Sequence, residues 1–236
     1  MIERVLELAK RSRRFEGFDL LLRDEHQVSL KFESGRLKES ALRQEAGINF
    51  RGVSRGNVGI AGTTDLSSDE ALEDLLRRAA ASAEQGEACA LAFPGPSHLP
   101  AVALFDDTAA GMDAAHLAEL GRRVVAQLKR PGWQVSASVD RFVETASFVN
   151  SAGQSFKSRA TAISVGAEVT RVKGDDVLMA YDDVTGAGAP SAAELDAIAA
   201  SVVRRLERGE KVVAPPEGKL PVLFTPQPMP LYLALL

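Results

Sequence analysis

The chain has 236 residues, a formal net charge of −4 and a hydrophobic content of 45%, which is ordinary for a globular protein. The acidic balance argues against a broad DNA-binding surface. A single cysteine excludes an intramolecular disulfide and favours a reducing compartment, and no apolar run approaches the roughly 20 residues that cross a bilayer. The sequence therefore predicts a soluble, cytoplasmic protein with neither DNA nor a membrane as a partner.

The chain opens with an amphipathic helical pattern. Apolar residues recur at helical spacing from Ile2 to Ala9, and Gly17 follows as a stop signal. Strand-like runs come next, and residues 23–26 are interpreted as a turn between the first two; the predicted strands are 18–22, 27–33, 37–44, 47–53 and 58–62.

A helix is predicted after these strands, from Ser68 to about Gln85. Ser67 and Glu70 match a capping box, and leucines and alanines then line one face of the helical pattern. Residues 86–112 are rich in Gly, Pro and Ala and have no periodicity, so they are interpreted as a connector between two halves.

The second half repeats the arrangement of the first. A helix capped by Asp113 ends at Pro131, and Ser191 with Glu194 forms a capping box before a helix that reaches about Arg208. Strands are predicted between these two helices, at residues 133–139, 142–150, 155–172 and 177–183.

Residues 33–66 and 150–184 match each other at one constant offset. Gly35 falls opposite Gly153, and Gly56 falls opposite Gly174. Turns of a few residues join successive strands and are too short for parallel crossovers. We expect an α+β fold of two pseudo-repeated antiparallel meanders packed with helices on one face, with halves at about residues 1–90 and 110–212.

The last residues change character again. Pro215 to Gly218 is typical of a boundary linker, and a buried-strand pattern follows at Leu220 to Phe224. We expect one domain over residues 1–218 and the start of a further domain, not contained in this chain, over residues 219–236. Large apolar side chains would then be exposed and drive association: Val222, Leu223, Phe224, Leu231, Leu233, Leu235 and Leu236.

Few residues are candidates for chemistry. The three histidines, His26, His98 and His116, have no second His or Cys at ligand spacing, and Cys89 has no base in its local sequence. Adjacent acids on a strand point to opposite faces, which is wrong for a cooperating pair; they occur at Asp106-Asp107, Asp175-Asp176 and Asp182-Asp183.

Glycines inside the predicted strands are open to two interpretations. Gly47, Gly59, Gly62 and Gly166 weaken a strand unless another group approaches the backbone closely. That group is either a packed helix or a bulged neighbour, or else an extended peptide added to an exposed edge of the sheet.

Several segments occur in an order and spacing that are specific when taken together: Glu33 to Arg36, Gly47 to Val53, Val58 to Ser67, Val149 to Gly153 and Pro221 to Phe224. In this order they resemble the N-terminal domain of the TldD/PmbA family, also called the modulator-of-gyrase or peptide-maturation family. The form Thr63-Thr64-Asp65-Leu66-Ser67 favours the PmbA (TldE) branch.

The resemblance implies a peptide-processing metalloprotease of two subunits, in which the TldD-type subunit carries zinc on a His-Glu-x-x-x-His helix and the PmbA-type subunit does not. This chain contains no such motif. We therefore expect no catalytic, cofactor-binding or metal-ligating residue in it, no activity by the chain alone, and zinc only in the intact complex.

The expected role is that of a substrate-handling and assembly domain. Its expected partners are a TldD-type subunit or a second copy of the chain, together with a peptide substrate. The alternatives are a non-catalytic peptide- or protein-binding scaffold and a modulator of gyrase.

Overall fold

A computed structural model describes residues 1–214, 216–221, 223–224 and 233. The elements follow one another as α1 (Ile2–Ser12), β1 (Gly17–Glu33), β2 (Arg36–Ser54), β3 (Asn57–Thr63), α2 (Asp69–Glu84), α3 (Asp107–Ala110), α4 (Ala114–Leu128), β4 (Trp133–Asn150), β5 (Ser155–Lys173), β6 (Asp176–Gly186) and α5 (Ala192–Gly209).

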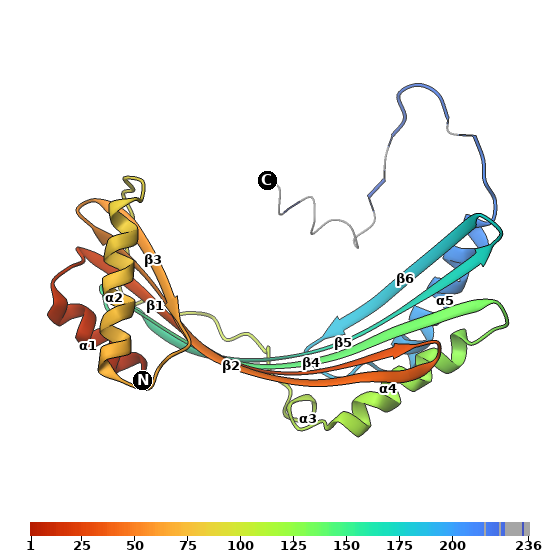
Figure 1. Ribbon diagram of the computed structural model, residues 1–236, viewed down its shortest axis with the longest axis horizontal. Helices are drawn as coiled ribbons and strands as arrows, with labels where there is room; N and C mark the ends of the chain where they lie inside the picture. Colours follow the sequence, from red (N-terminus) through yellow and green to blue (C-terminus); the bar gives the residue numbers. More distant parts are fainter. Residues whose placement is uncertain (215, 222, 225–232, 234–236) are drawn as a thin grey trace.

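The strands form one six-stranded sheet in the order β3-β2-β1-β4-β5-β6, and every neighbouring pair is antiparallel. The sheet is long and strongly curved, with α1 and α2 at one end and α3, α4 and α5 at the other (Figure 1). The two predicted meanders, β1-β2-β3 and β4-β5-β6, are therefore present, and the pairing of β1 with β4 joins them into one sheet.

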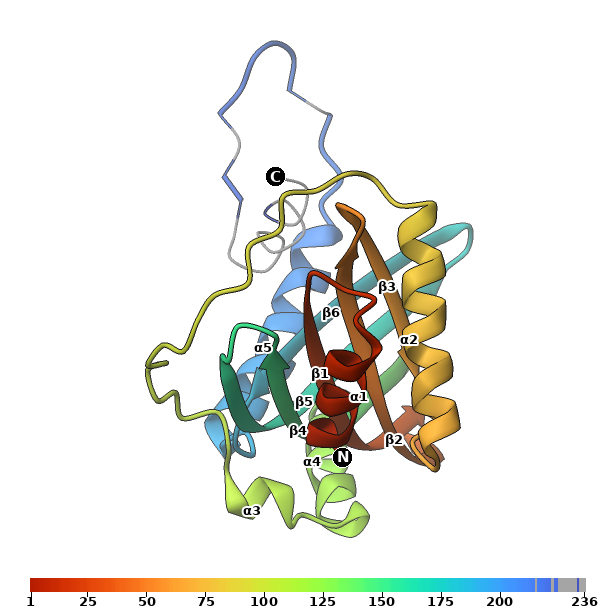
Figure 2. The same ribbon diagram turned by 90° about the vertical axis from the view of Figure 1, so that its left-hand side faces the viewer.

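All the packed helices lie on the same face of the sheet, as the fold class predicted. The even-numbered residues of β1 show this, because Phe18 and Leu20 are buried beneath α1 and α2, while Leu30 and Phe32 are buried at the α4 end. Side chains two residues apart share a face of a strand, so both ends use one face. This is the convex face, and the concave face carries no packed helix among the described residues (Figures 1 and 2).

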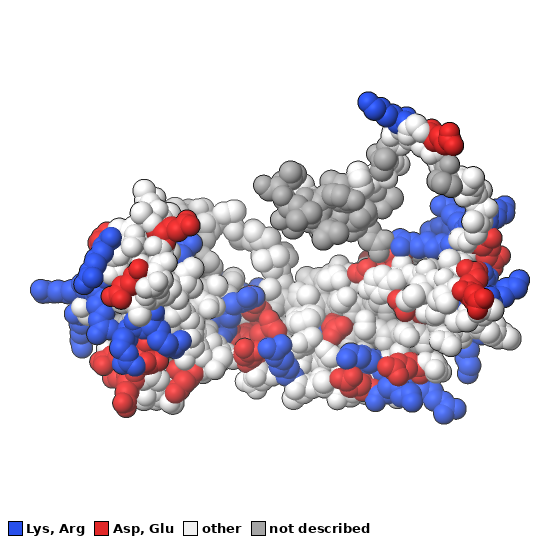
Figure 3. Space-filling model, turned by 45° about the horizontal axis from the view of Figure 1, so that its top comes forward, with Lys and Arg blue, Asp and Glu red and all other residues white. Residues whose placement is uncertain are grey.

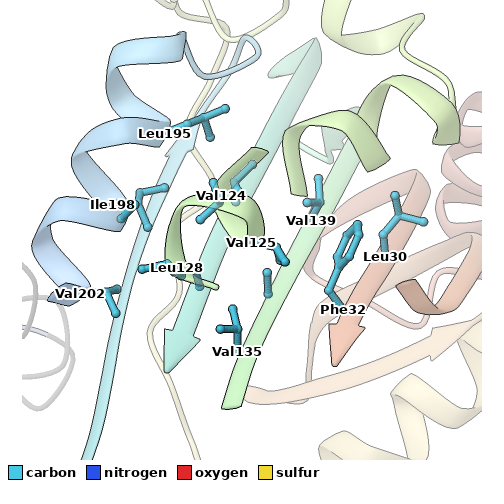
Figure 4. Packing of buried hydrophobic residues seen from close by; sticks show 14 of the residues in the cluster. Leu30, Phe32, Val124, Val125, Leu128, Val135, Val139, Leu195, Ile198 and Val202 are labelled. Carbon is cyan, nitrogen blue, oxygen red and sulfur yellow. The ribbon is translucent and has the colours of Figure 1, made fainter. Parts of the chain in front are cut away.

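Two separate hydrophobic clusters stabilise the two ends. The first packs leucines of α2, such as Leu72 and Leu76, against Phe50 of β2. The second packs α4 and α5 against β1, β4 and β5 (Figure 4), and its labelled members are Leu30, Phe32, Val124, Val125, Leu128, Val135, Val139, Leu195, Ile198 and Val202. The middle of the sheet contributes little to either cluster, so its strands are held mainly by their ladder hydrogen bonds.

The duplicated turns have the same backbone conformation. Gly35 and Gly153 both have positive φ angles, of 75° and 93°, and so do Gly56 and Gly174, at 78° and 61°. Only glycine adopts this conformation without a steric penalty, so the matched glycines fix equivalent turns in the two halves.

Three predicted strand breaks are wrong. Residues 23–26 form no turn, because β1 runs without interruption from Gly17 to Glu33. The predicted gaps at residues 45–46 and 140–141 likewise lie inside β2 and β4. Charged residues look like turns in a short window, but here they belong to continuous strands and are accommodated by tertiary contacts; the Arg141 side chain, for example, donates to the backbone oxygens of Ala110 and Met112.

The caps of the longer helices were predicted with one error. Ser191 and Glu194 form the expected capping box of α5. The N-cap of α2 is Ser68 rather than Ser67, because the Ser68 side chain accepts a hydrogen bond from the backbone N–H of Ala71. Ser67 donates instead to the Asp65 carboxylate, at 2.6 Å.

The residues after α5 form no strand where they are described. Leu220, Pro221, Leu223 and Phe224 lie outside any regular element, so the strand predicted there is not seen in these residues. Val222, Leu231, Leu235 and Leu236 lie outside the described residues. None of the helices in the described part of the chain has both the length and the apolar character needed to span a membrane.

The packing of α2 on β3 gives a first prediction. A Cβ atom at Gly59 would lie 2.0 Å from the backbone oxygen of Ala79 in α2, whereas nothing lies within 4 Å of one at Gly95. We expect Gly59→Ala to lower the free energy of unfolding by about 1–3 kcal/mol, since α2 must move away from the sheet. Urea unfolding should show no comparable loss for the control Gly95→Ala, and equal stabilities of the two variants would contradict this packing.

The cap assignment gives a second prediction. Ser68→Ala should lower the free energy of unfolding by about 1 kcal/mol, because the N–H of Ala71 loses its acceptor. Ser67→Ala is the matched control, and it should change stability by less than half as much in the same denaturant titration. A larger effect at Ser67 would restore the cap assignment made from the sequence.

Candidate functional site

The outer edge of β2 is open over most of its length. β3 pairs with β2 only between Ile48 and Ser54. From Arg36 to Gly47, the outer side of β2 has no neighbouring strand among the described residues. This open segment runs from the α4 end of the sheet to its uncovered middle, beyond the end of α2 (Figure 1).

The backbone groups that face the open edge follow from the hydrogen bonds of β3. The N–H of Ile60 donates to Ser82 Oγ and the C=O of Gly62 accepts from Arg78, so both residues direct their main-chain groups away from β2. In an antiparallel pair, two directly opposed residues either bond to each other or both face away. The partners of these residues in β2, Arg51 and Asn49, must therefore direct their N–H and C=O groups toward β1. The same alternation turns the N–H and C=O groups of four residues toward the open edge: Ser40, Leu42, Gln44 and Ala46.

A cavity of about 660 Å³ lies where β3 ends and the open edge begins. Its floor is formed by the last residues of β3 and by the β2 residues beside them, and charged side chains of β1, β2 and α2 form its walls. The lining residues are Arg23, Glu25, Arg43, Glu45, Gly47, Ile48, Asn49, Gly62, Thr63, Thr64 and Arg78.

The strand glycines divide between the two interpretations that the sequence left open. Gly59 lies beneath α2 and Gly166 lies beneath the Tyr181 ring, so close packing accounts for both. Gly47 and Gly62 instead line the cavity, where a Cβ atom would lie 3.1 Å from the Thr63 oxygen or 2.8 Å from Asn49 Oδ1. These two glycines keep the end of β3 close to β2 at the cavity floor.

The charges around the cavity form a row across three strands. Glu25 of β1 is paired in register with Glu45 of β2 and with Glu144 of β4, so three carboxylates are neighbours on the concave face. Arg23 Nε donates to Glu144 at 2.9 Å, and Arg43 forms an ion pair with Glu45. A group of residues of both signs is visible near the middle of this face (Figure 3). The arrangement suits polar or charged side chains of either sign.

Arg23 and Glu25 were missed as site residues because they were interpreted as part of a turn. A signal for them was present in the sequence. Apolar residues occupy the even positions of β1 on both sides of this segment, and continuing that alternation places Arg23 and Glu25 together on the opposite face. The alternation of apolar residues across the whole length of β1 would have predicted one continuous strand.

The sequence candidates for metal binding are not brought together. His26 lies 3.4 Å from Asp24 in β1, His116 Nδ1 lies 2.7 Å from Asp113 at the start of α4, and His98 is in the exposed connector. In the part of the chain that the structure describes, no three or more His, Cys, Asp or Glu side chains are grouped so as to hold a metal ion. These residues do not fit the zinc that the family resemblance implies.

The other candidates have structural roles or none that the contacts define. Asp106 caps α3 by accepting from Ala109 N–H at 2.7 Å. On β6, Asp182 lies 3.6 Å from Arg205 of α5 on the helix-covered face, so its neighbour Asp183 points to the other face, as expected for adjacent strand residues. Cys89 is exposed in the connector.

The far half of the concave face holds a smaller hollow, of about 260 Å³, at Gly166 and Tyr181. Partial burial raises the pKa of the Tyr181 phenol, and the nearby carboxylates of Asp183, Asp182 and Asp140 raise it further. Tyr181 therefore stays protonated across the neutral range and is a hydrogen-bond donor, not a base.

Comparison with known proteins supports the resemblance found in the sequence. Residues 18–83 match the family model described as PmbA/TldA metallopeptidase domain 1. The part of the chain from β1 to α2 is therefore similar to the first domain of PmbA/TldD-type proteins. The matched residues include β1, β2, β3 and most of α2, and so include the open edge and its cavity. The comparison with curated proteins gave no match.

Solved structures show the same fold at low sequence identity. TldE from Thermococcus kodakarensis aligns with a TM-score of 0.75 and 16% identity, over 90% of this chain and 48% of its own. Candidate modulators of DNA gyrase from Thermotoga maritima and Bacteroides thetaiotaomicron each align with a TM-score of 0.72, at 13% and 18% identity, over 90% and 87% of this chain. This chain spans about half the length of each of these proteins.

The alternation of backbone groups on β2 gives a third prediction. In amide hydrogen exchange followed by NMR, Gln44 and Ala46 should exchange faster than Arg43 and Glu45, because only the latter two donate into the β1 ladder. We expect a difference of about tenfold or more, the protection that a single ladder hydrogen bond provides. Equal protection of all four amides would show that another segment covers this edge.

Proposed function

We propose that this chain is the substrate-handling and assembly domain of a PmbA/TldD-type peptide-processing metalloprotease, and that the open edge of β2 receives the peptide. The observation that carries the proposal is the unpaired segment from Ser40 to Ala46 beside a 660 Å³ cavity. An edge with free N–H and C=O groups at strand spacing is complementary to the main chain of an extended peptide.

The direction of the bound peptide follows from the path of β3. The chain turns toward α2 after Thr63, where β3 ends. A peptide antiparallel to β2 would lie beyond this point, in line with β3. Each main-chain hydrogen bond would contribute about 0.5–1.5 kcal/mol, whatever the peptide sequence. Arg43, Glu45 and Glu25 would then select among the peptide side chains on the concave face.

Zinc chemistry in this proposal belongs outside the present residues. The matched model is described as a metallopeptidase, while the described His, Cys, Asp and Glu side chains form no metal-binding group. A metal carried by a further domain or by a TldD-type partner subunit would supply the hydrolytic step. The described residues of this chain would hold the substrate in an extended form.

An assembly role is supported by apolar side chains that follow α5. Val212 is 93% exposed, Val213 is 78% exposed and Leu223 is 91% exposed. Exposed aliphatic side chains at this density are stabilised when another surface covers them. A TldD-type subunit or a second copy of the chain is the partner we propose, with this domain in a PmbA-type role.

A non-catalytic binding scaffold is the alternative that the same edge supports. The two functions differ in one property, because a scaffold binds peptides but gives no peptide cleavage in any assembly. Gyrase modulation through direct DNA contact is disfavoured by the net charge of −4 and by the mixture of both signs on the surface (Figure 3).

Peptide binding at the β2 edge gives the fourth prediction. The probe is a fluorescein-labelled heptapeptide in which threonine alternates with lysine and glutamate. Gln44→Pro removes an N–H that faces the open edge, so we expect it to weaken binding about 5- to 10-fold in fluorescence anisotropy. Proline is tolerated on a strand edge where the lost N–H faces solvent.

Gln44→Ala is the matched control, because it truncates the same side chain and keeps the N–H. It should bind within about twofold of the unchanged protein, since the affinity of strand addition comes from the main chain. Circular dichroism of both variants confirms that they fold. If Gln44→Pro binds the probe as well as Gln44→Ala does, the peptide does not add to this edge.

A further inference from the structure

We propose a second peptide-binding edge on the opposite side of the sheet, formed by residues 155–160 of β5, which takes an extended segment that carries a large apolar side chain. This site goes beyond the function proposed for β2. It differs from the β2 edge in position and in the chemistry of its cavity, so the two proposals can be tested separately.

The outer edge of β5 is left open in the same way as that of β2. β6 pairs with β5 only between Ile163 and Lys173. From Ser155 to Ala160, no strand of the described chain pairs with the outer side of β5. The two open segments are equivalent in the duplication, because each follows a matched turn glycine, Gly35 or Gly153, and precedes a shorter third strand.

One hydrogen bond fixes the direction of the backbone groups on this edge. The N–H of Thr161 donates to the backbone oxygen of Leu104 in the connector, at 2.9 Å, so the main chain of Thr161 points outward. By alternation, the N–H and C=O groups of Lys157 and Arg159 point outward as well. The bond to Leu104 also shows that this edge already forms a main-chain hydrogen bond with another segment.

The connector borders the open segment without pairing along it. Ser97 N–H donates to Gln154 Oε1 at 2.6 Å near the start of β5, and Leu104 accepts from Thr161 near the other end of the open segment. Between these contacts residues 98–103 are exposed. The unpaired length of β5 between Gln154 and Thr161 is sufficient for a peptide of a few residues.

An apolar cavity of about 430 Å³ adjoins this edge. Ile2 and Leu6 of α1 line it on the convex face, beside the end of the β4–β5 hairpin, while the stacked rings of Phe148 and Phe156, whose centroids are 5.0 Å apart, lie on the concave face of the same hairpin. Phe156 is 36% exposed, so the ring stack reaches the surface. Figure 2 shows α1 beside the end of the β4–β5 hairpin.

These features together specify the class of ligand. Outward N–H and C=O groups at strand spacing require an occupant with its own main-chain donors and acceptors, which an extended peptide supplies and a lipid chain does not. Side chains of an added strand alternate between its two faces, so every second one lies against the aromatic lining that Phe156 and Phe148 form on the concave face. A phenylalanine or leucine suits that lining, whereas the arginines and glutamates at the β2 cavity favour polar side chains.

The experiment uses two labelled heptapeptides and variants on both edges. The apolar probe alternates threonine with phenylalanine, and the charged probe alternates threonine with lysine and glutamate. Lys157→Pro removes an outward N–H and should weaken the apolar probe about 5- to 10-fold, while the matched control Lys157→Ala should bind within about twofold. Phe156→Ala removes the ring that borders the open edge on the concave face and should weaken the same probe about tenfold or more.

Three outcomes would overturn the proposal. The apolar probe could show no saturable binding to the unchanged protein, it could bind Lys157→Pro and Phe156→Ala as well as the unchanged protein, or it could be weakened by Gln44→Pro and not by the β5 variants. Loss of charged-probe binding in Gln44→Pro alone concerns only the β2 edge. Because Phe156 is partly exposed, Phe156→Ala should keep its fold, and its thermal unfolding midpoint verifies this.

Discussion

The pairing of β1 with β4 is the interaction on which the rest of the structure depends. It runs in continuous antiparallel register from Asp19–Asn150 to Glu33–Ser136 and joins two meanders that would otherwise be separate three-stranded sheets. The joined sheet buries a hydrophobic cluster at each end, one under α1 and α2 and the other under α4 and α5, and β1 contributes to both. The long central ladder holds these two ends at a distance and gives the curved shape seen in Figure 1.

The same pairing explains why both open edges exist. With β1 and β4 in the centre, the outer strands of the sheet are β3 and β6, and each is shorter than the strand it pairs with. The unpaired lengths of β2 and β5 therefore lie on opposite sides of the uncovered middle. Natural proteins shorten, charge or cover such edges to prevent aggregation, and here charged side chains accompany the β2 edge. An edge of this kind is also suited to transient binding of a peptide.

The two edges have the same backbone geometry but different chemistry. At β2, Gly47 and Gly62 keep the strands close, and side chains of both signs surround the cavity. At β5, apolar residues of α1 border the edge on the convex face, and the phenylalanine rings border it on the concave face. The two meanders thus share a backbone arrangement and carry different side chains at their open edges. A protein that holds unfolded peptides of varied composition would gain from such a division.

Local signals in the sequence determined the parts of the fold that depend on neighbouring residues. The matched turn glycines, the capping box at Ser191 and the short connections that require antiparallel pairing were all readable, because turns and caps are set by residues within a few positions. The family resemblance and the fold class followed from the order of such signals.

Only the tertiary structure decided how the halves meet and where the sheet is left unpaired. No local pattern specifies that β1 pairs with β4, since ladder hydrogen bonds use main-chain groups that every residue shares. The charged residues from Arg23 to His26 were mistaken for a turn for the same reason, because their place in a strand depends on partners far along the chain. Likewise, whether a strand glycine packs beneath a helix, as Gly59 does, or lines a cavity, as Gly47 does, is set by what other elements leave beside it.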